Sequence, residues 1–141
     1  MNADFHRIVL ASFEDVIANY QFEVRLPVWW LIELTSDTCI VRLVYDSGFI
    51  EAQLVYPQEK AERQAVKRPD GFPSGYPMYS INSVWKYLYP DDREDFRYHG
   101  NDIEGQAKAI RQLIVERLTG VLKGDFSWLP GYIGSNKMKN P

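Results

Sequence analysis

The sequence contains few of the residues on which covalent or metal-dependent catalysis relies, with one cysteine and two histidines among 141 residues. Cys39 has no cysteine partner and lies in the apolar run Cys39-Ile40-Val41, where a buried, unreactive thiol is the usual state. His6 and His99 have no second histidine or cysteine at metal-ligand spacing. We therefore expect no bound metal, no cofactor and no cysteine–histidine pair, and a reducing cytoplasm as the location.

Long hydrophobic runs and basic clusters are also missing. The longest apolar run, Leu26 to Ile32, has seven residues, whereas a membrane-spanning helix needs about 20. The apolar stretch from Ile8 to Phe13 is preceded by Arg7 alone and followed directly by acidic residues, which is unlike a signal peptide. Lys67-Arg68 is the only adjacent basic pair. We expect neither a membrane nor a nucleic acid as a partner.

Known catalytic and nucleotide-binding motifs are absent as well. The nine glycines form no phosphate-binding loop followed by Lys-Ser or Lys-Thr, and no serine stands in a nucleophile elbow. The composition is that of an ordinary globular protein, with 45% hydrophobic and 25% charged residues and a net charge of −3. We expect a single domain over residues 1–134 and a flexible tail over 135–141.

Helical periodicity is present in the first and last thirds of the chain. Apolar residues recur every three or four positions and predict an amphipathic helix over residues 3–19, a short helix over 81–89 and a long helix over 103–123. Asn101 stands three residues before Glu104, which is the pattern of a capping box at the start of the long helix.

Between residues 21 and 56 the period changes to two, which is typical of strands with one buried face. Pro27 and two polar turn sequences divide this region. The predicted strands are 21–26, 28–35, 38–45 and 49–56. Because the connections are short, we expect an antiparallel meander of three or four strands, with the strand at 28–35 in its centre. The stretch 57–77, with four prolines, is expected to be a long irregular loop.

The densest group of titratable residues follows Pro90. It comprises Asp91, Asp92, Glu94 and Asp95, with His99 close behind. Carboxylates and an imidazole could bind a cation or transfer protons if the fold brought them together, but the spacing matches no calcium loop. A solvated surface and a partner-binding surface are the alternatives.

Aromatic residues are concentrated just before this acidic group. Tyrosine and tryptophan combine a large apolar area with a polar tip, which suits both core edges and interfaces. Tyr76, Tyr79, Tyr87 and Tyr89 are open to either role, whereas Trp85 is expected to pack against the sheet. We take Tyr87 and Tyr89 with the four acidic residues as candidate partner-binding residues, because the acids could steer a basic protein toward aromatic anchors.

The order of elements also supports a resemblance. The strand pair around Tyr45-Asp46, the helix start Tyr79-Ser80-Ile81 and the ending Lys123-Gly124-Asp125-Phe126 resemble small uncharacterised bacterial proteins found among the immunity proteins of polymorphic toxins. The resemblance spans residues 5–128. It implies a stoichiometric binding protein without catalytic residues.

These observations together predict an α+β domain in which an antiparallel sheet packs against the N-terminal and C-terminal helices. The expected function is non-catalytic protein binding, with a basic toxin domain as the partner to be neutralised. The alternative is a small-molecule-binding protein or small hydrolytic enzyme, with a pocket between the sheet, the 57–77 loop and the acidic segment. The sequence leaves the oligomeric state open.

Overall fold

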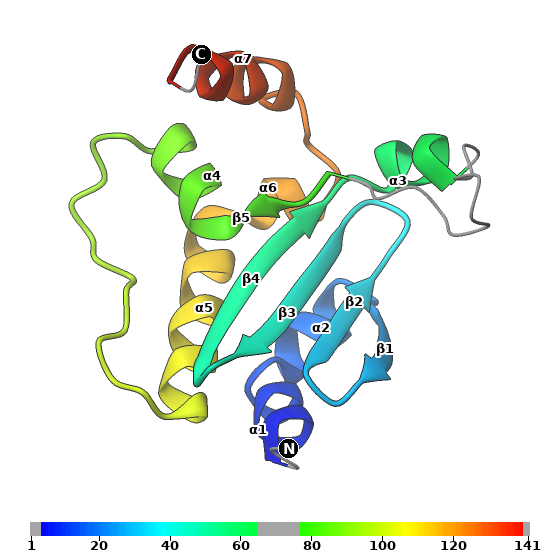
Figure 1. The fold of residues 1–141 in the computed structure, drawn as a ribbon, viewed down its shortest axis with the longest axis vertical. Coiled ribbons are helices and arrows are strands. Elements are labelled where there is room, and N and C mark those ends of the chain that lie inside the picture. The colour runs from blue at the N-terminus through cyan, green and yellow to red at the C-terminus, as the bar shows by residue number, and fades with distance from the viewer. Residues whose placement is uncertain (1–3, 65–76, 140–141) are drawn as a thin grey trace.

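The computed structural model describes residues 4–64 and 77–139, with side chains described for 4–61 and 77–136. Within these ranges the chain forms helices around one sheet (Figure 1). The helices are α1 (Asp4–Ser12), α2 (Glu14–Asn19), α3 (Pro57–Gln64), α4 (Ile81–Leu88), α5 (Ile103–Arg117), α6 (Thr119–Leu122) and α7 (Leu129–Lys139). The strands are β1 (Glu23–Val28), β2 (Leu31–Thr35), β3 (Ile40–Asp46), β4 (Phe49–Val55) and β5 (Tyr79–Ser80).

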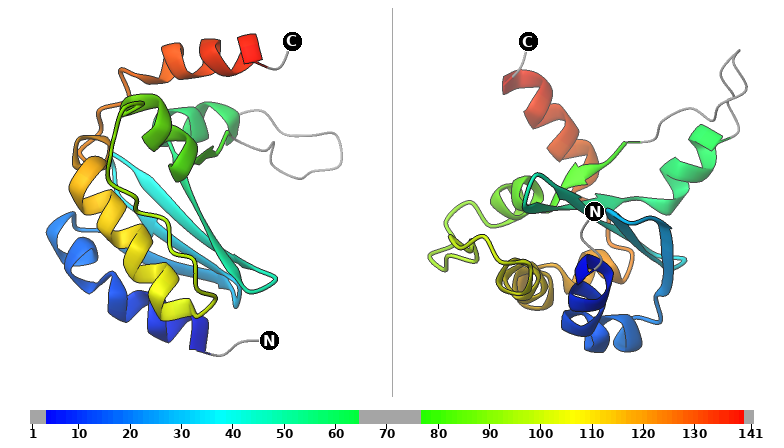
Figure 2. Two further views of the ribbon diagram at one scale, coloured as in Figure 1. Left: turned by 90° about the vertical axis from the view of Figure 1, so that its left-hand side faces the viewer. Right: turned by 60° about the horizontal axis from the view of Figure 1, so that its bottom comes forward.

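The sheet is antiparallel throughout, in the order β1-β2-β3-β4-β5. Helices α1, α2 and α5 lie behind the sheet in the view of Figure 1, and Figure 2 shows them as a layer along one of its faces. The predicted α+β class and meander are confirmed. The fifth strand has only two residues, so it is too short to be predicted from an alternating pattern.

The core lies between this helix layer and the inward face of the sheet. Ala52 and Leu54 of β4 are buried, whereas Glu51 points outward and is exposed. Leu54 is opposite Val41, and Ala52 is opposite Leu43, so the inward residues of neighbouring strands form continuous apolar rows. The predicted period of two is therefore confirmed for residues 51–54 of this strand.

Two of the predicted helices are divided into shorter ones. The helix predicted over 3–19 bends at Phe13 and the long one at Leu118, which are 1% and 0% exposed. Helical hydrogen bonds continue past both bends, from Phe13 N–H to Val9 and from Leu118 N–H to Ile114. Because the residues at the bends are buried like the other apolar residues of these helices, the three- and four-residue spacing in the sequence continues across each bend. The sequence therefore gives no sign of the bends.

The helix α5 begins at Ile103, as predicted, but its capping residue differs from that of the expected capping box. Asp102, and not Asn101, is the N-cap, and its carboxylate accepts a hydrogen bond from the Gly105 N–H at 2.8 Å. Glu104 forms an ion pair with Lys108 one turn further on, at 2.7 Å.

Two segments for which no regular structure is expected form helices. The 57–77 stretch begins with α3, whose first residue is Pro57, a position that proline favours. The remainder of that stretch, including Lys67-Arg68 and Tyr76, lies largely outside the described residues. The C-terminal helix α7 includes residues 135–139 of the predicted tail, although its two glycines lower helix propensity.

Candidate protein-binding surface

The first hairpin turn is where the sequence prediction and the structure differ most. The start of the predicted strand 28–35 is wrong, because Val28 pairs with Leu31 and the chain turns at Trp29-Trp30. Its remainder is β2, which pairs with a strand on each side as predicted. The strand β1 therefore runs through Pro27 and forms the edge of the sheet, while β2 begins after the second tryptophan. Pro27 indicated an edge strand, but alternation alone cannot locate a turn made of two large apolar residues.

A tryptophan pair is an unusual choice for a two-residue hairpin turn. Such turns favour positive φ at one or both central positions, which asparagine and glycine supply at little cost. The second hairpin follows this rule, with φ of 52° at Ser47 and 91° at Gly48. Among the described non-glycine residues, only Gln21 and Ser47 have positive φ, so the Trp29-Trp30 turn is of neither favoured type. Turn chemistry therefore does not explain these two residues.

The same turn and the end of β1 leave a group of large apolar side chains at the surface. Leu26 is 46% exposed, Val28 40%, Trp29 38% and Trp30 39%. Together with Pro27 they form most of the longest apolar run in the chain, and we call them the Leu26–Trp30 edge. An apolar group concentrated in this way marks an interaction site more often than scattered surface residues do.

The backbone of β1 is protected against pairing with another strand. Pro27 has no N–H to donate, and the register shifts between Arg25 and Val28, as at a β-bulge. Charged Glu23 and Arg25 stand at its start, joined by an ion pair of 3.5 Å. These are the devices by which edge strands avoid aggregation. The side chains of this edge, rather than its backbone, are therefore available for contact.

A hollow of about 450 Å³ lies beside the tryptophan turn. It is lined by Trp29, Trp30, Val44, Tyr45, Asp46 and Ser47. The turn is fixed to β3 by a hydrogen bond of 2.9 Å from the Tyr45 N–H to the Trp30 carbonyl oxygen. The Tyr45 ring is supported from within by the fully buried Phe5, at a centroid distance of 5.4 Å. The wall of the hollow is thus continuous with the core.

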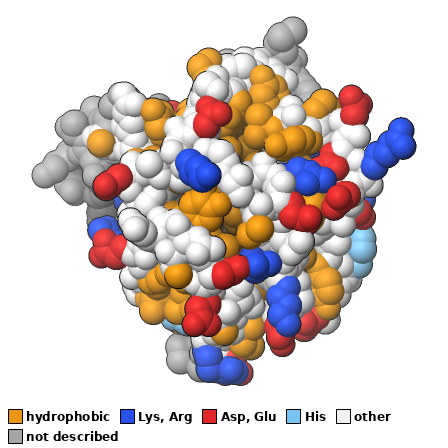
Figure 3. Space-filling view, turned by 180° about the vertical axis from the view of Figure 1, so that it is seen from behind, with side chains coloured by type: hydrophobic (Ala, Val, Ile, Leu, Met, Phe, Trp, Pro, Cys, Tyr) orange, Lys and Arg blue, Asp and Glu red, His pale blue; other side chains and the backbone are white. Residues whose placement is uncertain are grey.

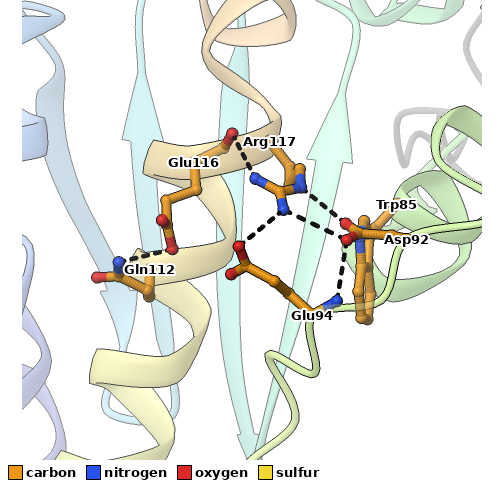
Figure 4. A network of polar contacts seen from close by, with 6 residues as sticks. All are labelled: Trp85, Asp92, Glu94, Gln112, Glu116 and Arg117. Atoms are coloured by element: carbon orange, nitrogen blue, oxygen red, sulfur yellow. Dashed lines mark hydrogen bonds and ion pairs between the residues drawn. The ribbon is translucent and has the colours of Figure 1, made fainter.

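The predicted site residue Asp92 is held in a hydrogen-bond network within the protein. Its side chain is 8% exposed, and its carboxylate accepts hydrogen bonds from Arg117 Nε at 2.7 Å and Trp85 Nε1 at 2.8 Å (Figure 4). Arg117 Nη2 also lies 3.4 Å from Glu94 Oε1. The Arg117 hydrogen bond, with that of Trp85 second, holds the pKa of Asp92 well below its usual range. This network fixes residues 91–101, the acidic strap, to α4 and α5.

The other predicted acidic residues are more exposed, and part of their charge is matched locally. Asp95 is paired with Arg97 at 2.9 Å, and this hydrogen bond lowers the pKa of Asp95 to about 2. Glu94 shares Arg117 with Asp92, while Asp91 is exposed. The structure therefore brings Asp92 and Glu94 together and leaves Asp91 and Asp95 apart from that pair.

The predicted tyrosines also fall into two groups. Tyr87 and Tyr89 are 37% and 43% exposed, so both could contact a partner. The ring of Tyr87 also packs edge-on against Tyr132 of α7, and the Tyr89 ring lies 5.8 Å from the Arg117 guanidinium carbon. Tyr79 is only 8% exposed and donates its hydroxyl hydrogen to Glu59 of α3, so it serves packing. Tyr76 lies outside the described residues.

Cys39 and the two histidines have separate environments and partners. Cys39 is fully buried, and burial raises the pKa of its thiol to about 12. His6 is within hydrogen-bond distance of the Val28 carbonyl oxygen, at 3.1 Å, and His99 lies 3.8 Å from Asp95. Within residues 4–64 and 77–139, no group of three histidine, cysteine or acidic residues could hold a metal ion.

The face of the sheet opposite the helix layer carries a polar row. Glu33, Arg42, Gln53 and Ser80 are directly opposite one another across β2, β3, β4 and β5. Arg42 Nε and Gln53 Oε1 are buried without a hydrogen-bond partner. Such groups reduce stability, because each loses water without gaining a protein partner.

The Leu26–Trp30 edge is the candidate surface that sequence reasoning missed. The apolar run is too short for a membrane span, and its alternation predicts a central strand rather than a turn. A usable signal was present nonetheless. A proline within a strand pattern indicates an edge, and an edge strand cannot bury the apolar residues that follow it on both faces.

The architecture defines the class: an α+β domain with a five-stranded antiparallel meander covered on one face by helices. No family model, curated protein or solved structure matches the chain. None of the described helices has the length and apolar character to cross a membrane. Acidic and basic side chains are interspersed over the face seen from behind in Figure 3.

Proposed function

We propose that the protein is a non-catalytic protein-binding protein and that the Leu26–Trp30 edge is its principal contact surface. One observation supports this above all others. Five of the seven residues of the longest apolar run, Leu26 to Trp30, lie on an exposed edge strand and turn, and only Leu31 and Ile32 enter the core. Apolar side chains in such a place lower stability in water and become favourable when a partner covers them.

The residue types fit an interface. Tryptophan is enriched among the residues that dominate protein–protein binding, and its truncation at such positions costs about 2 kcal/mol or more. Trp29 and Trp30 end the Leu26–Trp30 edge and also line the hollow, so they connect the two parts of the surface. The protected backbone of β1 favours docking by side chains over the addition of a strand.

The finer proposal is that the partner is a basic toxin domain that this protein neutralises. Its support is the resemblance of Tyr79-Ser80-Ile81 and Lys123-Gly124-Asp125-Phe126 to immunity proteins, together with the excess of acid in the chain. Toxins that act on nucleic acids need a basic surface, to which an acidic protein is complementary. A cytoplasmic location belongs to the same proposal.

The pocket expected for a small-molecule site, between the sheet, the 57–77 stretch and the acidic strap, is not formed by the described residues. The described part of the 57–77 stretch, α3, and the acidic strap lie on opposite sides of the sheet, so these two segments do not line one pocket (Figure 1). The crevice between the strap, β4 and α5 has about 200 Å³, below the roughly 300–1,000 Å³ of typical small-molecule sites.

Site-specific photo-crosslinking in the native host tests the proposal. A photoreactive phenylalanine derivative replaces Trp30, and a matched control carries it at the exposed Lys123, directly after α6. We expect one protein to be captured from position 30 and not from 123, and to form a stoichiometric complex when both proteins are purified. Absence of any reconstituted complex, or equal capture from both positions, would contradict the proposal.

The toxin step has its own test. The captured partner is expressed alone and together with this protein, and cell growth is measured. We expect growth arrest by the partner alone and rescue by co-expression. A partner that is harmless when expressed alone would remove the immunity function while leaving protein binding in place.

A further inference from the structure

We propose that the hollow beside the Trp29-Trp30 turn receives an arginine side chain of the protein partner. This inference rests on the proposed protein-binding function and adds the chemistry of one contact within it. The hollow is formed where the two hairpin turns, β1–β2 and β3–β4, lie at the same end of the sheet (Figure 1).

The walls supply aromatic faces. Two tryptophans and one tyrosine are among its six lining residues, and the rings of Trp29 and Tyr45 are 6.0 Å apart at an angle of 54°. Cations are attracted to aromatic ring faces, most strongly to tryptophan, and the flat guanidinium of arginine can also stack on a ring. Because Tyr45 packs on Phe5, one wall is fixed before a ligand arrives.

The charge of the hollow is that of a cation site. Asp46 is the only charged residue of the lining, and its carboxylate accepts a hydrogen bond of 3.0 Å from the Ser47 hydroxyl. Residues 1–56 carry eight acidic and three basic side chains. Two of the three basic residues are already paired, Arg7 with Asp4 and Arg25 with Glu23. An incoming cation thus meets the Asp46 carboxylate, which no basic residue of the lining neutralises.

Aromatic walls with one carboxylate distinguish arginine from the other candidates. A purely apolar side chain would leave the Asp46 carboxylate facing an uncharged group, and an acidic one would be repelled by it. The planar guanidinium can lie on a ring while donating hydrogen bonds to the carboxylate. The partner contact is therefore expected to combine a stacked arginine in the hollow with apolar side chains on the Leu26–Trp30 edge.

The indole N–H signals of the four tryptophans provide a site-specific measurement by ¹⁵N-correlated NMR. The probe is Nα-acetyl-arginine amide, and its neutral counterpart is Nα-acetyl-citrulline amide, in which a urea replaces the guanidinium. Trp85 and Trp128 serve as internal controls, because their indole N–H groups are bonded to Asp92 and to the Asp125 carbonyl oxygen, away from the hollow. Trp29→Phe and Trp30→Phe assign the two signals of the turn.

We expect the arginine probe to shift the Trp29 and Trp30 signals in a saturable manner and to bind about threefold to tenfold more tightly than the citrulline probe. Asp46→Asn should remove most of this difference, whereas Asp37→Asn, in the turn at the opposite end of the sheet, should preserve it. The backbone spectrum of each variant verifies that it is folded.

Equal affinities for the two probes, or equal shifts at all four indoles, would overturn the arginine site. The outcome is independent of the proposed function. If the partner still requires Trp29 and Trp30 while the probes bind alike, protein binding stands and the cation contact is wrong. If the arginine probe binds selectively but no partner is captured, the hollow binds a guanidinium group and the proposed protein-binding function is wrong.

Discussion

At the scale of single residues, Asp92 shows how a predicted contact residue can belong to the fold. The sequence places it in an acidic cluster, which suggests four equivalent exposed carboxylates. The structure instead buries its side chain between Trp85 and Arg117. Arg117 is 25 positions away, so no local pattern could have revealed this pairing. Neutralising Asp92 is therefore expected to affect the fold, unlike neutralising the exposed Asp91.

Asp92→Asn should therefore lower the urea midpoint of unfolding clearly more than Asp91→Asn, whose side chain is exposed. The substitution removes the charge that pairs with Arg117 while preserving the size of the side chain. Equal midpoints for the two variants would show that the network contributes nothing to stability.

The pH dependence has a defined sign. Since the folded-state pKa of Asp92 is lowered, its contribution is complete above the ordinary carboxyl pKa of about 4 and is lost as the pH falls below it. We expect the difference in stability between the wild type and Asp92→Asn to be constant near neutral pH and to shrink in acid. Urea unfolding at a series of pH values measures it, and a difference that grows in acid would contradict this assignment.

Cys39 gives a second prediction at this scale. Burial raises the pKa of its thiol to about 12, so almost no thiolate is present at neutral or mildly alkaline pH. We expect no reaction with a disulfide reagent at pH 8 in the folded protein and one reacting thiol per chain after denaturation. Rapid labelling of the native protein would show that Cys39 is accessible.

At the scale of elements, β4 is the strand that the sequence predicts best. Leu54 is 0% exposed and opposite Val41 in the core, so Leu54→Ala should reduce the free energy of unfolding by about 2–5 kcal/mol. Gln53→Ala should change it little, because that substitution removes a buried oxygen without a hydrogen-bond partner. Urea unfolding compares the two, and equal losses would mean that the assigned inward face is wrong.

An element can be predicted from the sequence when local interactions determine it, and not when contacts with distant residues do. Periodicity identifies β4 and α5 because their buried faces are regular over several turns or residues. It misses α7, whose two glycines disfavour a helix and whose aromatic contacts with Tyr79 and Tyr87 come from distant parts of the chain. It also misses the Trp29-Trp30 turn, because a turn without glycine, asparagine or proline carries no local signal.

This turn provides the element-scale prediction that separates binding from packing. Trp29→Asn with Trp30→Gly supplies the residues that two-residue hairpin turns favour and removes both exposed indoles. The gain in turn geometry and the loss of the contact between Trp29 and Tyr45 offset each other, so stability should change by less than about 1 kcal/mol. A loss of about 3–5 kcal/mol, as for a core tryptophan, would show that these residues serve packing.

At the scale of the whole molecule, two candidate surfaces lie on different sides of the sheet. The Leu26–Trp30 edge is at the β1 side, and the acidic strap with Tyr87 and Tyr89 is at the α4 and α5 side (Figure 1). Three acids of the strap are engaged by Arg97 and Arg117. We therefore assign affinity to the edge, while the exposed acids of the strap contribute long-range attraction to a basic partner.

The two roles predict different kinetic effects. A variant with Asp91→Asn, Glu94→Gln and Asp95→Asn, which preserves Asp92, should slow association with the partner and reduce its dependence on salt. Its dissociation rate should stay close to that of the wild type, since rim charges act mainly on encounter. Unchanged association and salt dependence in surface-binding kinetics would show that the strap does not guide the partner.

The affinity of the purified partner for the Trp29→Asn/Trp30→Gly variant, measured by isothermal titration calorimetry beside the wild type, tests the proposed binding surface most directly. The variant is expected to be as stable as the wild type, so a change in affinity reports on contact alone. We predict a loss of about 100-fold or more, because two exposed tryptophans of the contact surface are removed. An affinity within twofold of the wild type would contradict the assignment of the Leu26–Trp30 edge as the binding surface.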